Sequence, residues 1–273
     1  MPNLNLYTKY KRVWDAKENS LDTLYQYIKH LCIDIDDYGN ITVYNTPKTS
    51  LAAFCCHLDT VHSDKPNIHV IKNDILISTN DVGVGGDDKC GIVACLEMLE
   101  SDVPCKAIFF REEETGCKGS IAYNAKSLQN DLFLIEIDRK GDSDLIFNSG
   151  GTQLCDNQFE NEVKKAFPHG KKAQGLFTDV NVLGNAQINM MNLSAGYYLP
   201  HTKNEYVVLS DLQRTIDFLY NFAKNYTEKR KYIRKQTGGL YEGYIGRGFW
   251  NFCEEDKGAG AEDYAMLQGL EKE

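Results

Sequence analysis

Several short apolar runs in this chain end in residues that bind metal ions. The runs at residues 54–56, 109–110, 132–135 and 197–199 are followed by imidazole or carboxylate side chains, namely His57 with Asp59, Glu112 to Glu114, Glu136 with Asp138, and His201. A fifth acidic pair, Asp87 and Asp88, follows two glycines and opens a helix-like segment. Ligand sites in open α/β sheets form where the carboxyl ends of strands converge. The pattern therefore predicts one shared metal centre at the strand ends.

The order of apolar patterns predicts the fold class. Helical spacing covers residues 20–32, 88–99, 120–126, 157–167 and 210–226, and short apolar or alternating runs predict strands at 33–35, 41–43, 51–56, 68–71, 75–77, 106–110, 132–137, 145–147 and 188–191. Ser210 and Gln213 have capping-box spacing at the start of the last helix. Strands that alternate with helices, together with hairpins, predict a three-layer αβα sandwich with a mixed central β-sheet.

Composition limits the classes of function. The chain has 273 residues, a net charge of −9 and a pI near 5.2, which disfavours an unaided nucleic-acid partner. The first residues lack the pattern of a secretory signal, and no apolar run is long enough to span a bilayer, so we expect a cytoplasmic protein without a membrane partner. The nine cysteines show no CxxC pair, which argues against thiolate zinc sites, and without a secretory signal we expect no disulfides.

Imidazole nitrogen and carboxylate oxygen are ligands that suit zinc. One carboxylate shared by two ions, with one histidine and one carboxylate on each, would make the paired site of two-metal hydrolases, with ions about 3.5–4 Å apart. The available set is His57, Asp87, Glu114, Asp138 and His201. Glu113 is outside this ligand set and is therefore available as a general base. By itself, however, the acidic run at 112–114 is also typical of a solvated turn after a strand.

Five motifs, at residues 57–60, 86–91, 112–116, 137–138 and 201–205, occur in an order that resembles a known family. In this order they are similar to the co-catalytic zinc exopeptidases, which include peptidase T, the zinc aminopeptidases and related N-acyl amino acid deacylases. The resemblance covers roughly residues 15–227. It implies that Asp87 bridges two zinc ions, for which Co²⁺ and Mn²⁺ are alternatives, that His57 and Asp138 hold one ion, and that Glu114 and His201 hold the other.

The resemblance also assigns roles beside the ligands. Glu113 becomes the general base that takes a proton from the attacking water, and Asp59 becomes the carboxylate that orients His57. The peptide bond between Asp87 and Asp88 is expected to be cis. Glu112 is left as a solvated or salt-bridged side chain.

The layout departs from peptidase T in one respect. Only 63 residues separate Asp138 from His201, too few for an additional lid or dimerisation domain besides the rest of the sheet. We therefore expect residues 1–227 to form a catalytic domain alone and residues 228–273 to be a C-terminal extension, whose structure the sequence does not determine.

Three functions remain open at this point. The first is a dinuclear zinc aminopeptidase acting on short peptides, the second is a deacylase acting on N-acyl amino acids, and the third is a binding protein that kept the fold but lost turnover. The sequence does not determine an oligomeric state. His62, His69 and His169 match no motif, and we expect surface or loop roles for them. Residues 150–152 and 177–179 could be turns or could line a substrate pocket.

Overall fold

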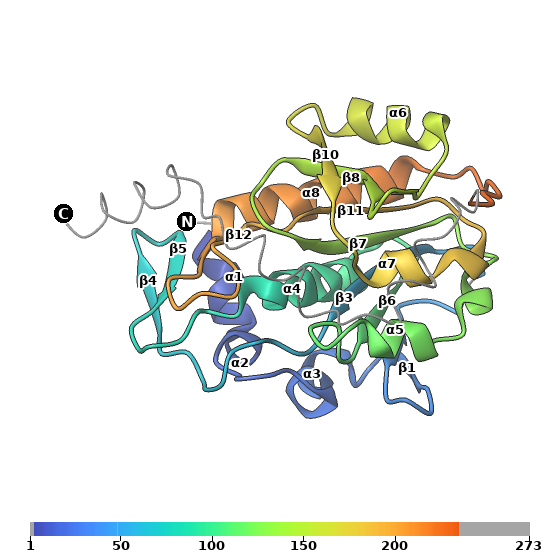
Figure 1. Ribbon diagram of the computed structural model, residues 1–273. Coiled ribbons are helices and arrows are strands. Elements are labelled where there is room, and N and C mark those ends of the chain that lie inside the picture. Colours follow the sequence, from blue (N-terminus) through green and yellow to red (C-terminus); the bar gives the residue numbers. More distant parts are fainter. Residues whose placement is uncertain (1–2, 48, 235–273) are drawn as a thin grey trace.

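The computed structural model describes residues 3–47 and 49–234, and within them nine strands form one mixed sheet (Figure 1). The strands are β1 (Cys32–Ile35), β2 (Ile41–Tyr44), β3 (Ala52–His57), β6 (Cys105–Phe110), β7 (Phe133–Arg139), β8 (Asp144–Ser149), β9 (Thr152–Gln153), β10 (Lys171–Gly175) and β11 (Met190–Ser194). Their order is β1-β2-β6-β3-β7-β11-β8-β10, and β9 pairs with β8. The central strands β6, β3, β7 and β11 are mutually parallel. Their carboxyl ends consequently lie at one edge of the sheet.

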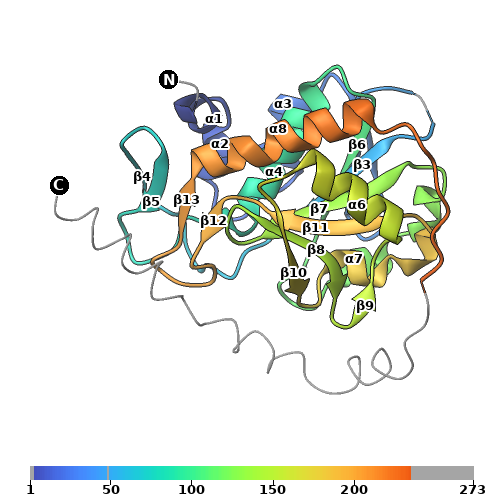
Figure 2. The same ribbon diagram turned by 90° about the horizontal axis from the view of Figure 1, so that it is seen from above.

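Helices cover both faces of this sheet (Figures 1 and 2). One face carries α1 (Asn3–Lys9), α2 (Lys11–Trp14), α3 (Leu21–Ile28), α4 (Gly86–Glu100), α6 (Asn157–Ala166) and α8 (Leu209–Asn225). The other face carries shorter elements, namely α5 (Lys118–Ala122), α7 (Asp179–Val182) and the 3₁₀ turns η1 (Ala125–Leu128) and η2 (Gly184–Ala186). The expected three-layer sandwich with a mixed sheet is therefore confirmed.

Alternation along the strands decides which face each side chain reaches. Phe54 and Cys56 of β3 pack in the large cluster with α4 and α8, whereas Cys55 packs in the smaller cluster on the opposite face. In β7, Ile137 belongs to the large cluster and Leu134 to the smaller one. Because side chains alternate with a period of two, His57, Glu136 and Asp138 are placed on the side of the smaller cluster.

A small second sheet lies beside the first (Figure 1). Its strands are β4 (Ile68–Ile71), β5 (Ile75–Ser78), β12 (Tyr197–Tyr198) and β13 (Tyr206–Val208), in the order β12-β13-β5-β4. The hairpin of β4 and β5 was predicted from the sequence, whereas β12 and β13 were not. The turn that joins β12 to β13 contains His201, so this small sheet brings the last predicted ligand to the main sheet.

Some expected element boundaries are wrong. The first predicted helix ends at Ile28, and its expected last residue, Cys32, begins β1 instead. The expected capping box of the last helix does not form, because α8 begins at Leu209 and Ser210 lies inside it. Asp74 takes over the capping role: it accepts hydrogen bonds from the Ser210 backbone N–H (2.8 Å) and hydroxyl (2.8 Å). A residue 136 positions away thus replaces the local cap.

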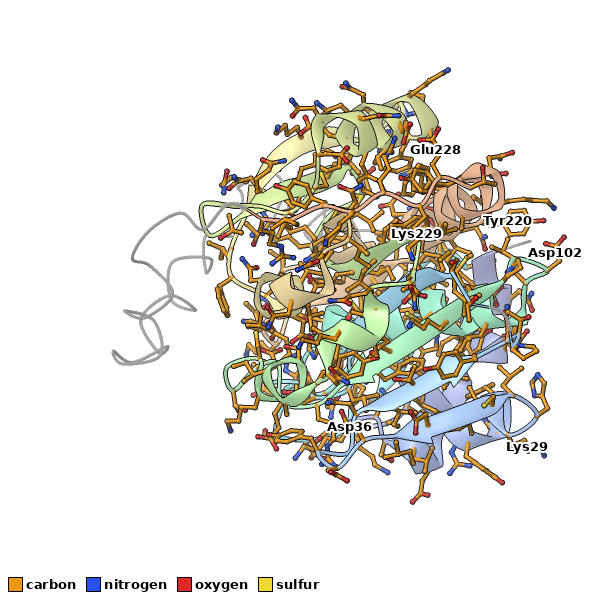
Figure 3. The ribbon with its side chains drawn as sticks, turned by 90° about the vertical axis from the view of Figure 1, so that its right-hand side faces the viewer. Lys29, Asp36, Asp102, Tyr220, Glu228 and Lys229 are labelled. Carbon is orange, nitrogen blue, oxygen red and sulfur yellow. The ribbon has the colours of Figure 1, made fainter. Side chains whose placement is uncertain are left out.

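Residues 228–234 return along the domain after α8. Figure 3 shows Glu228 and Lys229 on the side of the molecule where the chain leaves that helix. Lys229 Nζ donates a hydrogen bond to Asn130 Oδ1 at 2.9 Å, and the backbone of Lys231 forms an isolated antiparallel β-bridge with Ile188. Residues 235–273, most of the expected extension, lie outside the described part of the chain. Among the described helices, none is long and apolar enough to cross a membrane.

Candidate metal centre

Three parallel strands deliver most of the predicted site residues to one edge of the sheet. His57 is the last residue of β3, and Asp138 is the last but one of β7. Glu113 and Glu114 lie in the turn that follows β6. Adjacent pairing of β6, β3 and β7 therefore brings the ends of three segments together that are far apart in the sequence.

Asp87 lies between the two predicted histidine ligands. Its Oδ1 is 3.0 Å from His57 Nε2, and its Oδ2 is 3.2 Å from His201 Nε2. The residue stands at the start of α4, after Gly85, whose φ of 72° is in the left-handed region. The peptide bond from Asp87 to Asp88 is cis, as expected from the resemblance. Each oxygen of one carboxylate thus faces a different imidazole.

The remaining two predicted ligands complete two groups around Asp87. His201 Nε2 is 3.3 Å from Glu114 Oε1, and His57 Nε2 is 3.9 Å from Asp138 Oδ1. All five residues that the sequence singled out as metal ligands therefore lie together in the structure.

Asp88 also lies within reach of this centre, with His57 and Asp138. Its two oxygens, however, accept hydrogen bonds from the backbone N–H groups of His57 (3.2 Å) and Gly91 (2.9 Å). Gly91 is needed for this approach, because a Cβ there would lie 2.4 Å from the Asp88 carboxylate. Asp88 consequently joins the end of β3 to the first turn of α4.

Asp59 contacts the site in more than one place. Its Oδ1 is 3.4 Å from His57 Nδ1. Its two oxygens also accept hydrogen bonds from the backbone N–H groups of Glu113 and Glu114, each at 3.1 Å. The sequence suggested only the contact with the imidazole. The structure adds that Asp59 holds the turn carrying Glu113 and Glu114.

Glu113 is half-buried beside the five expected ligands. Burial raises the pKa of its carboxyl group well above the ordinary value. Its Oε1 is 3.5 Å from Sγ of Cys117, the residue that directly precedes α5. Glu112, in contrast, points outward and pairs with Lys118 at 2.8 Å, which confirms the expectation of a salt-bridged side chain.

The electrostatics of the cluster suit a bound cation. Burial, followed by the charge of Asp87, raises the pKa of both Glu114 and Asp138. Burial alone would lower the pKa of His201, but the adjacent carboxylates of Asp87 and Glu114 raise it to about 12. Crowded buried carboxylates disfavour their own ionisation, so the site as a whole favours added positive charge.

Buried polar atoms that lack hydrogen bonds indicate whether metal ions fit among the five clustered residues. Glu114 Oε1 and His57 Nδ1 are both buried without a hydrogen bond of acceptable geometry. Such atoms are rare in proteins unless an ion or a water completes them. A buried carboxylate oxygen without a hydrogen bond and a donor set of imidazoles and carboxylates match the ligands of zinc. The residues present therefore fit the metal centre that the resemblance implies.

Several residues that support the site were not identified from the sequence. Tyr197 donates its hydroxyl hydrogen bond to Asp138 Oδ1 at 2.9 Å, and Thr178 donates to Glu136 Oε1 at 2.9 Å. Thr178 belongs to the 177–179 stretch, for which a turn and a pocket lining were both considered. Glu205 closes the last sequence motif and is fully buried beside His62. No local spacing signals these contacts, because each joins distant segments.

Comparison with known proteins identifies the fold. No protein-family model and no curated protein sequence matches the chain. Among solved structures, the chain is similar to aminopeptidase PepT from Bacillus cereus ATCC 10987, with a TM-score of 0.71 at 14% identity over 82% of this chain and 98% of that one. A tripeptidase from Staphylococcus aureus subsp. aureus mu50 gives a TM-score of 0.68 at 12% identity over 82% of this chain and 100% of that one.

An archaeal structure extends this likeness. Aminopeptidase APDkam598 from Desulfurococcus kamchatkensis gives a TM-score of 0.64 at 12% identity, over 83% of this chain and 96% of that one. The architecture predicted from the resemblance to zinc exopeptidases is thereby confirmed, and the chain has the fold of these peptidases.

Proposed function

We propose that the protein is a dinuclear zinc exopeptidase, an aminopeptidase that acts on short peptides. The observation that carries this proposal is the position of Asp87, whose two oxygens lie 3.0 Å and 3.2 Å from the imidazoles of His57 and His201. A carboxylate that faces two histidines, each with a further carboxylate nearby, is the arrangement expected of a ligand shared by two ions.

In this proposal the five clustered residues divide between two ions. Asp87 is shared, His57 and Asp138 hold one ion, and Glu114 and His201 hold the other. Bound zinc supplies Lewis acidity, which polarises a scissile carbonyl and lowers the pKa of water.

Glu113 is the residue proposed to move the proton. It is half-buried next to Glu114 but lies outside the two groups around Asp87. As a carboxylate it takes a proton from the attacking water as the oxygen bonds to the carbonyl carbon. The same carboxyl group can then give that proton to the departing amine nitrogen as the C–N bond breaks. Asp59 supports this step by holding the N–H groups of Glu113 and Glu114.

The substrate class rests on the fold and on the layout of the chain. The similar solved structures are an aminopeptidase, a tripeptidase and a second aminopeptidase by their descriptions. Between β7 and β12 the chain adds strands to the main sheet, with α6 and α7, rather than a separate domain. This supports a catalytic domain within residues 1–227 that acts by itself on short peptides. The cytoplasmic location in this proposal rests on the sequence alone.

Metal analysis combined with a substrate panel tests the proposal. Purified protein is loaded with Zn²⁺, Co²⁺ or Mn²⁺ and assayed on aminoacyl, peptidyl and N-acyl amino acid substrates. We expect about two ions per chain and release of amino-terminal residues. The variant Glu113→Gln should retain both ions but lose about 10²–10⁴ in turnover, whereas Glu114→Gln should lose one ion.

The opposing outcomes are distinct. Cleavage of N-acyl amino acids without cleavage of peptides would replace the aminopeptidase by a deacylase. Bound metal without turnover of any substrate would indicate a binding protein. Equal loss of metal from Glu113→Gln and Glu114→Gln would contradict the division of roles between base and ligand.

A further inference from the structure

A largely buried histidine, His62, and a fully buried glutamate, Glu205, pair next to the candidate metal centre. His62 Nε2 is 2.7 Å from Glu205 Oε2, and the exposed fractions of the two side chains are 10% and 0%. A carboxylate only accepts hydrogen bonds, so Nε2 of the imidazole is the donor. The sequence suggested a surface or loop role for His62. It does lie in a loop, but its side chain is directed inward.

Glu205 carries this contact to the backbone that holds Asp87. Its Oε2 also accepts a hydrogen bond from the Gly85 N–H at 2.7 Å, and its Oε1 accepts one from the Asp87 N–H at 3.0 Å. The carboxylate therefore has three donors, two from the turn that begins α4 and one from His62. Hydrogen bonds to a buried charged acceptor are stronger than neutral ones, so this turn is firmly held.

His62 has a defined slot in the structure. A Cβ at Gly83 would lie 2.5 Å from His62 Nε2 and 2.5 Å from the carbonyl oxygen of Thr202, so the ring needs the bare backbone of glycine at that position. Thr202 follows His201, and the Glu205 N–H donates back to the Thr202 carbonyl at 3.2 Å. The pair thus lies between the turn with Asp87 and the turn with His201.

We propose that His62 and Glu205 are positioning residues, which hold the Gly85–Asp87 backbone so that the Asp87 carboxylate faces both metal positions. This inference rests on the proposed function, because it concerns how the shared ligand is oriented. Glu205 touches no expected reacting atom and acts through the Asp87 backbone, while His62 acts through Glu205. Since Asp87 is shared, loss of the His62–Glu205 pair weakens the binding of both ions. Loss of Glu114, in contrast, weakens the binding of one ion.

The test compares metal affinity in variants of His62. His62→Ala removes the donor, His62→Gln restores an N–H donor of similar reach, and His69→Ala changes an exposed histidine of β4 as a matched control. The Zn²⁺ dissociation constants of both ions are measured by competition with a chromogenic chelator, and near-ultraviolet circular dichroism of the metal-free proteins checks folding. Partners of this kind typically change metal affinity by about 10–100-fold.

We expect His62→Ala to raise the Zn²⁺ dissociation constants of both ions by at least about tenfold. His62→Gln should recover most of the lost affinity, and His69→Ala should bind zinc as wild type does. Unchanged constants in His62→Ala, with tight wild-type binding, would refute this inference and leave the proposed function intact. Equal weakening in His62→Gln and His62→Ala would show that donation to Glu205 is not the cause. Wild-type protein that takes up no zinc would refute the proposed function, and this inference with it.

Discussion

Replacing Asp59 tests how the turn after β6 and the imidazole of His57 depend on one carboxylate. Asp59 accepts backbone hydrogen bonds from Glu113 and Glu114, and its side chain is only 13% exposed. The variant Asp59→Ala removes both acceptors and leaves two N–H groups unpaired. Asp59→Asn keeps one acceptor but turns an N–H₂ group toward the other donor.

The structure sets the expected size of the loss. A hydrogen bond to a charged group contributes about 1.5–3 kcal/mol, so the two bonds to Asp59 together contribute about 3–6 kcal/mol to the free energy of unfolding. We expect Asp59→Ala to lose an amount in this range and Asp59→Asn to lose about half of it. Because His57 also loses its neighbouring carboxylate, zinc affinity should fall by about 10–100-fold in both variants.

Urea unfolding of the metal-free protein, followed by circular dichroism, measures the stability change without any contribution from metal. Chelator competition measures zinc affinity separately. Asp64→Asn serves as the control, because Asp64 is exposed and, within residues 3–47 and 49–234, its side chain accepts a hydrogen bond only from the neighbouring Lys65 N–H. An Asp59→Asn protein with the urea midpoint and zinc affinity of wild type would refute the reasoning, since both predicted effects come from the same oxygens.

Two further predictions concern stability. Phe133 is fully buried, and its ring centroid lies 5.2–6.1 Å from those of four other aromatic rings. Phe133→Ala should therefore lower the free energy of unfolding, measured by urea titration, by about 3–5 kcal/mol. A change under about 1 kcal/mol would mean that neighbouring side chains fill the cavity. Burial alone would raise the pKa of Asp142, but His169 and Arg214 lower it below its usual 3.8. A depressed carboxyl pKa stabilises the fold above the unfolded value and loses that effect as the pH falls, so Asp142→Asn should be less stable than wild type near neutral pH, and the difference should shrink below about pH 4. A difference that grows on acidification would contradict this sign.

The main elements followed from local pattern, and the exceptions have physical causes. The apolar runs at 51–56, 106–110 and 132–137 predicted strands, and the strands β3, β6 and β7 that form there are buried over most of their length. β10 was missed because its sequence, KKAQG, is polar, as suits a strand at the edge of the sheet. The four-residue helix α7 is too short for a helical period to be visible.

In the candidate site, too, one part was visible in the sequence and another was not. The types and order of His57, Asp87, Glu114, Asp138 and His201 were sufficient to single them out as a set. The supporting hydrogen bonds were not visible in the sequence, because Tyr197, Glu205 and their partners are separated by tens of residues.

The sequence by itself therefore determined which residues alternate into a buried sheet and which ligand-type side chains stand at its strand ends, because both depend on spacings of two to four residues. Only the tertiary structure decided which oxygen of Asp87 faces which imidazole, that Asp74 caps α8, and that His62 reaches Glu205. These contacts depend on the order β6-β3-β7 and on where the small sheet returns the chain. That order results from packing the whole core, which local spacing does not encode.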